Sequence, residues 1–168
     1  ATAISGATAT GVGALGVGLA AQANQSNAIA IGNSAQAQTG NTIAIGKSAV
    51  ANSSSGAAPS SAIALGADAN ATGLGTIAIG RASGVLSQNI MHPNLNHNNI
   101  AIGNTARVGD PSSSKITQSI AIGSGNRVDS QGRPEGAWAK GDQSIAVGGN
   151  VLANGNSSVA IGGDDLDL

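Results

Sequence analysis

A four-residue phrase, two branched aliphatic residues around an alanine and then a glycine, recurs along nearly the whole chain. It is first complete at residues 29–32 (Ile-Ala-Ile-Gly) and last at residues 159–162 (Val-Ala-Ile-Gly), and a degenerate copy, Leu-Gly-Val-Gly, stands at residues 15–18. The glycines that close successive copies are separated by 14, 14, 20, 14, 23, 20, 25 and 14 residues. Fourteen residues is therefore the basic unit, and the longer gaps are insertions into it. Self-similarity at a fixed period predicts a solenoid, in which each unit packs on its neighbours.

The composition fits a thin, repetitive core better than an ordinary globular one. The 168 residues include 26 glycines, no cysteine and a single aromatic residue, Trp138, and only 9% are charged. The large side chains that dominate globular cores are missing, whereas small side chains are enough to fill a solenoid. The formal net charge of −1 gives no reason to expect a nucleic-acid partner. No apolar run is long enough to span a membrane.

One unit, residues 27–40, contains two short strands and two turns. In the first strand, residues 29–31, both isoleucines project to one face and the alanine to the other, because side chains alternate along a strand. In the second, residues 35–37, both alanines face inward and the glutamine faces solvent. The fold class is therefore predicted to be all-β: a parallel β-roll of 14-residue coils over residues 1–163. Polar residues before the phrases are predicted to stack into hydrogen-bonded ladders at one turn, namely Asn27, Asn41, Ser61, Asn99, Ser119, Ser144 and Ser158.

The first strand of each coil is apolar on both faces in every complete copy. Strands of this kind are covered on both sides. The lumen of the roll can cover one side, and since the sequence contains no amphipathic helix, another copy of the chain must cover the other. Burial contributes about 1.5–3 kcal/mol per aliphatic side chain, which over eight phrases predicts a homo-oligomer without fixing the number of chains. The residues predicted to form the core and the contact between chains are Ile29, Ile31, Ile43, Ile45, Ile63, Leu65, Ile77, Ile79, Ile100, Ile102, Ile120, Ile122, Ile145, Val147, Val159 and Ile161.

Four insertions are predicted, at residues 53–60, 86–98, 109–118 and 129–143. Each is placed after a second strand and before the next phrase, so all four are expected to leave the roll at the same corner. Surface insertions cost little free energy, and loops on a rigid scaffold often carry recognition. Residues 164–168 are expected to lead from the roll into a following region.

Tryptophan and arginine are enriched at binding hot spots. The candidate ligand-contact residues are therefore Arg107, Arg127, Arg133, Trp138 and Lys140. A structural role competes for Trp138, in which the indole folds back onto its own insertion.

The two histidines, His92 and His97, lie five residues apart with no carboxylate or cysteine beside them. Such a pair is a poor metal site. Neither a metal nor another cofactor is therefore expected.

The repeated phrase also resembles that of a known family. Asn27-Ala28-Ile29-Ala30-Ile31-Gly32 and Ser158-Val159-Ala160-Ile161-Gly162, each taken as followed by a small-residue strand, resemble the head repeat of trimeric autotransporter adhesins of the Yersinia adhesin A type. The resemblance runs from about residue 14 to residue 163. It implies a left-handed roll, a homotrimer around a common axis, and display on the outer membrane of a Gram-negative bacterium.

The same resemblance implies a function. Heads of this family bind host surfaces such as collagen, fibronectin or laminin, and promote autoaggregation and biofilm formation. The sequence is expected to be a head fragment, whose contact with the membrane would run through a C-terminal anchor outside it.

Three other functions compete with an adhesin head. A structural spacer of a surface fibre, with little ligand binding of its own, is the alternative. An ice-binding solenoid needs a regular outward array of threonine, but the outward positions of the second strands vary. An enzyme is not expected, because the helical acyltransferases repeat every six residues and sugar-cleaving solenoids need clustered carboxylates. The outward positions of the second strands, which lack the threonine array of an ice-binding solenoid, are Gln36, Val50, Asn70, Gly84, Arg107 and Leu152.

Overall fold

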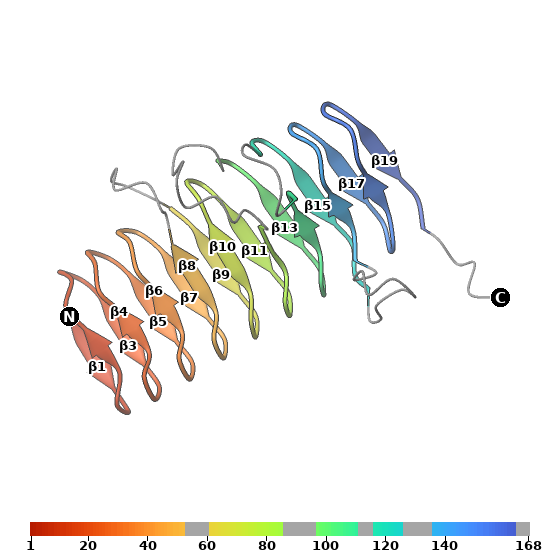
Figure 1. Cartoon of the computed structure of the whole chain (residues 1–168). Helices are drawn as coiled ribbons and strands as arrows, with labels where there is room; N and C mark the ends of the chain where they lie inside the picture. The colour runs from red at the N-terminus through yellow and green to blue at the C-terminus, as the bar shows by residue number, and fades with distance from the viewer. Residues whose placement is uncertain (53–60, 86–96, 111–115, 126–135, 164–168) are drawn as a thin grey trace.

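The computed structural model describes residues 1–52, 61–85, 97–110, 116–125 and 136–163. These residues contain strands and turns but no helix, and they form two sheets of parallel strands (Figure 1). The predicted all-β roll is confirmed. Each coil contributes its first strand to one sheet and its second strand to the other.

The first sheet contains the repeated phrases. Its strands, in spatial and chain order, are β1 (Thr2–Ile4), β3 (Leu15–Val17), β5 (Ile29–Ile31), β7 (Ile43–Ile45), β9 (Ile63–Leu65), β11 (Ile77–Ile79), β13 (Ile100–Ile102), β15 (Ile120–Ile122), β17 (Ile145–Val147) and β19 (Val159–Ile161).

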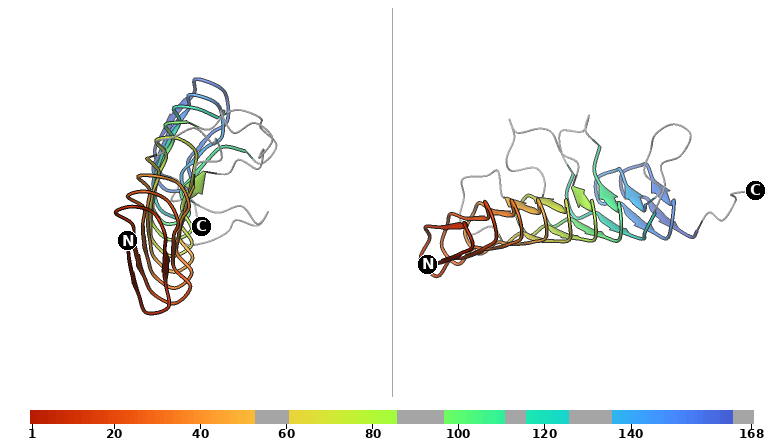
Figure 2. Two further views of the ribbon diagram at one scale, coloured as in Figure 1. Left: turned by 90° about the vertical axis from the view of Figure 1, so that its left-hand side faces the viewer. Right: turned by 90° about the horizontal axis from the view of Figure 1, so that it is seen from below.

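The second sheet contains the small-residue strands. In order they are β2 (Thr8–Ala9), β4 (Gln22–Ala23), β6 (Gln36–Ala37), β8 (Val50–Asn52), β10 (Asn70–Thr72), β12 (Gly84–Val85), β14 (Arg107–Val108), β16 (Trp138–Ala139) and β18 (Leu152–Ala153). Figure 2 shows the two sheets lying face to face in flattened coils that stack into a rod.

The register of both sheets keeps equivalent residues of successive coils side by side. Ile29 pairs with Ile43, which pairs with Ile63, although the second interval is longer than 14 residues. An insertion therefore leaves the register unchanged, and each column of the roll contains the same position of the repeat.

Alanine fills the lumen. The central alanine of the first strand is fully buried in coil after coil, as at Ala30, Ala78 and Ala121. The inward pairs predicted for the second strands are also buried, including Ala35 and Ala37. The two aliphatic residues of the phrase point the other way, away from the lumen, and are mostly half-buried or exposed. Of the two apolar faces of the first strand, the alanine face is thus the inner one.

The common corner predicted for the four insertions is wrong for the last of them. Residues 53–60, 86–96 and 111–115 each join a second strand to the next first strand, whereas residues 126–135 join β15 to β16 and so belong to the opposite turn. Trp138, placed by the sequence within the insertion 129–143, lies in strand β16 of the roll. The physical reason is that Ala137 and Ala139 put two fully buried methyl groups into the lumen.

The polar residues at the turn before the phrase form two columns, where one turn ladder was predicted. The outer column includes Asn27, whose side-chain amide donates to the Asn41 side-chain oxygen at 3.1 Å. The inner column includes Asn99, Ser119 and Ser144, all fully buried. There the Ser119 backbone N–H donates to Asn99 Oδ1 at 3.0 Å, and the Ser144 N–H donates to Ser119 Oγ at 3.2 Å. The ladder is therefore continuous between these three coils inside the roll.

Candidate recognition surfaces

The outer face of the first sheet is a continuous aliphatic surface, here termed the aliphatic face. It is made of the first and third residues of each phrase, which are the residues predicted to form the contact between chains. Ile45 and Ile122 leave 38% and 40% of their surface exposed, and Val159 and Ile161 at the last strand leave 63% and 75%. Monomeric proteins seldom expose aliphatic residues in one unbroken strip.

The outer face of the second sheet has a different chemistry. In its N-terminal half it is polar: the Gln38 amide donates to Gln36 Oε1 at 2.6 Å, and the Asn52 amide donates to Gln38 Oε1 at 3.0 Å. In its C-terminal half the neighbouring outward residues are Arg107, Trp138 and Leu152, one from each of three adjacent strands.

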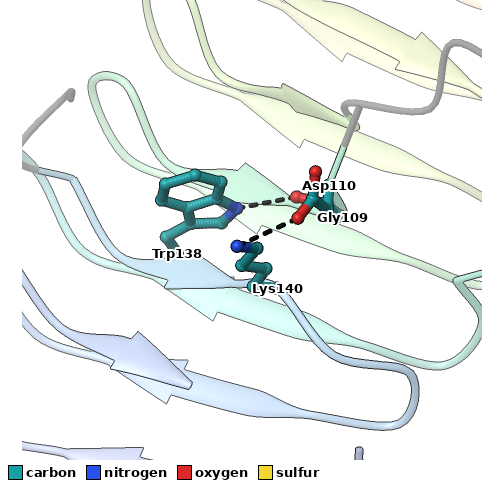
Figure 3. A network of polar contacts seen from close by, with 4 residues as sticks. All are labelled: Gly109, Asp110, Trp138 and Lys140. Carbon is teal, nitrogen blue, oxygen red and sulfur yellow. Dashed lines mark hydrogen bonds and ion pairs between the residues drawn. The ribbon is translucent and has the colours of Figure 1, made fainter. Parts of the chain in front are cut away.

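Trp138 is fixed by contacts with the preceding coil (Figure 3). Its indole N–H donates to the backbone oxygen of Gly109 at 2.7 Å. Lys140 Nζ lies 5.5 Å from the centre of the indole ring and 3.0 Å from Asp110 Oδ2. Lys140 therefore takes part in both contacts, an ion pair with Asp110 and a cation–π contact with the Trp138 ring, and each contact restricts its side chain.

Arg107 lies directly beside Trp138, because the two residues are register partners in parallel strands. Its guanidinium is half-buried, and this desolvation lowers its pKa from the ordinary value. Within the described residues, its side chain has neither an ion pair nor a hydrogen bond. A partly desolvated cation that has no partner in the described part of the chain can pair with an external anion.

The structure therefore brings together three of the five residues predicted to contact a ligand: Arg107, Trp138 and Lys140. The other two, Arg127 and Arg133, lie outside the described residues. Sequence reasoning did not select Gly109 and Asp110, although both follow β14 directly. The repeat itself could have indicated them, because the two residues that follow one second strand lie beside the two residues that follow the second strand of the next coil.

The metal-ligating side chains can be compared with the sequence prediction only where the structure describes them. His92 lies outside the described residues. Where the structure is described, no three His, Cys, Asp or Glu side chains are grouped to hold a metal ion. Over the same part of the chain, no helix has the length and apolar character needed to cross a membrane.

Comparison with protein families gives one match. A family model described as "YadA head domain repeat (2 copies)" matches residues 9–35, 26–49, 60–83, 135–150 and 139–164, which together cover more than half of the chain. The match at 135–150 includes β16, in agreement with the assignment of Trp138 to a coil. Neither a curated protein nor a solved structure matches this chain.

Proposed function

Because this chain belongs to the family of YadA head repeats, the cell-surface adhesin heads of trimeric autotransporters in Gram-negative bacteria, we propose that it attaches the cell to extracellular matrix. Collagen, fibronectin and laminin are the proposed matrix ligands. Contact between heads on neighbouring cells would give autoaggregation and biofilm growth. The proposed assembly is a homotrimer, held on the outer membrane by an anchor elsewhere in the protein.

The aliphatic face is the observation that carries this proposal. Within one chain the lumen is already filled by alanine, so the outward isoleucines have no partner in the described residues that would bury them fully. Two sister chains placed against this face would remove it from water. The resulting trimer would direct its three second sheets outward.

A trimeric head gains from multivalency. Three identical outer surfaces on one rod can bind a repetitive matrix fibre with an avidity well above the affinity of any one of them. No single tight pocket is then required. The alternative, a spacer with little binding of its own, predicts the same assembly but an inert outer surface.

Solid-phase binding of the purified trimer tests the proposal. The trimer is applied to wells coated with collagen, fibronectin, laminin or albumin, and beads that carry it are scored for clumping. We expect saturable binding to at least one matrix protein and clumping of the beads. Binding no greater than to albumin in every well would support the spacer instead.

A further inference from the structure

Trp138, Arg107 and Lys140 form a small surface on the second sheet, here termed the Trp138 surface. The hydrogen bond to Gly109 and the contact with Lys140 hold the indole in one orientation before any ligand arrives. A platform ordered in advance loses less conformational entropy on binding than a free side chain. This distinguishes Trp138 from an ordinary exposed aromatic residue.

The charges around the indole have a defined balance. Lys140 is paired with Asp110 at 3.0 Å, and the two charges offset each other. Among the residues that the structure describes, Arg107 then contributes one further positive charge beside the ring. The charged side chains described on the Trp138 surface thus have a net positive charge of one, which suits a ligand with a single negative charge.

The topology argues against an extended peptide as this ligand. β14 is hydrogen-bonded to β12 and β16, and β16 is hydrogen-bonded to β14 and β18. Neither strand offers the open edge on which an added peptide strand would pair. The ligand must lie on the face of the sheet and be held by side chains.

We propose that the Trp138 surface binds a saccharide unit that carries one carboxylate, such as a hexuronate in a matrix glycan. One face of a pyranose ring presents apolar C–H bonds that fit the flat indole. The carboxylate accepts paired hydrogen bonds from the planar guanidinium of Arg107. This inference specifies a ligand class for the proposed adhesin head and rests on that proposed function, because the second sheet must face solvent in the trimer.

Intrinsic fluorescence gives a direct assay, because Trp138 is the only aromatic residue of the chain. The trimer is titrated with an unsulfated hyaluronan octasaccharide, with the same octasaccharide after reduction of its carboxylates, and with an oligoglutamate of equal charge. We expect a saturable change in emission with the first probe alone. Arg107→Gln should weaken this binding about tenfold or more, and Arg107→Lys should restore only part of it.

Arg81→Gln is the matched control, because it removes the same charge from an exposed arginine in a turn of another coil. It should leave the affinity unchanged. Trp138→Ala, followed by calorimetry, should abolish binding while the trimer persists in sedimentation. Equal binding of the carboxyl-reduced sugar, equal binding of oligoglutamate, equal loss in Arg81→Gln, or no titration at all would each overturn the proposal. A trimer that does not bind the octasaccharide but still binds matrix protein would overturn this inference alone and leave the proposed function intact.

Discussion

Ile122 and Leu152 form a natural pair for testing the assembly. Ile122 lies on the aliphatic face and leaves 40% of its surface exposed, and Leu152 lies on the outer face of the second sheet with 44% exposed. In a lone chain, Ile122→Asp and Leu152→Asp would therefore have similar consequences. In the proposed trimer, only Ile122→Asp places a carboxylate in the contact between chains.

The size of the difference follows from burial. Full burial of an aliphatic side chain is worth about 1.5–3 kcal/mol, so covering the exposed 40% of Ile122 contributes about 0.6–1.2 kcal/mol per protomer. The substitution loses this term and adds the cost of desolvating a carboxylate, which is several kcal/mol per ion. Because a trimer contains three such carboxylates, its free energy of assembly should fall on the order of 10 kcal/mol.

Sedimentation equilibrium over a range of protomer concentrations measures this effect. We expect the parent and Leu152→Asp to remain trimeric at micromolar concentration, and Ile122→Asp to sediment as a monomer or to lose its fold. Circular dichroism separates these two outcomes. The reasoning is refuted if the parent itself is a stable, folded monomer, or if both variants keep the parent's mass.

Two further predictions concern packing in the roll, one at a turn and one in the lumen. Gly66 has φ +133°, and a Cβ on it would lie 2.5 Å from the Gly80 backbone oxygen. Gly66→Ala should therefore lower the free energy of unfolding by about 1–3 kcal/mol. Gly163→Ala is the control: a Cβ there would have no atom within 4 Å, so its free energy of unfolding should stay within about 0.5 kcal/mol of the parent. Both are measured by chemical denaturation at one fixed protomer concentration. Ala101→Leu should overpack the fully buried lumen position and lower the free energy of unfolding by about 1–3 kcal/mol. Ala67→Leu, at a half-buried turn position, should leave the stability nearly unchanged. Equal thermal midpoints for these two variants would contradict the alanine-filled lumen.

Much of the fold can be read from the repeat because each coil faces the same physical constraints. Alternation along residues 35–37 places two methyl groups inward, and the structure buries both alanines fully. The position of β16 was harder to predict. Asn126-Arg127-Val128 begins three residues after Gly123, which is the regular spacing of a second strand, whereas Ala137-Trp138-Ala139 lies eleven residues further along the chain. Only the second triplet gives the lumen two alanines.

The recognition surface was predictable in its residue types but not in its arrangement. Trp138 and Arg107 are separated by 31 positions in the sequence, yet they are register partners. Their proximity depends on which triplet forms β16, and that choice depends on the long insertion before it. The contact of Lys140 with Asp110 follows from the same register. Once β16 is placed, the cluster follows from the parallel pairing.

The first strand points its alanine into the lumen and its two isoleucines outward, and the packing of the lumen explains both this orientation and the chemistry of the two outer faces. Both faces of the strand are apolar, but the isoleucine side chains of one face are much larger than the alanine methyl group of the other. The turn from Ile31 to Gln36 contains four residues and brings the two sheets close together, so that the lumen accommodates alanine where the two columns of isoleucine would not fit. The narrow lumen thus forces the isoleucines outward and leaves a long aliphatic strip on one side. The second sheet, whose inner face is filled by methyl groups, is free to vary its outer residues from coil to coil, and this variation is what places an arginine beside the single tryptophan.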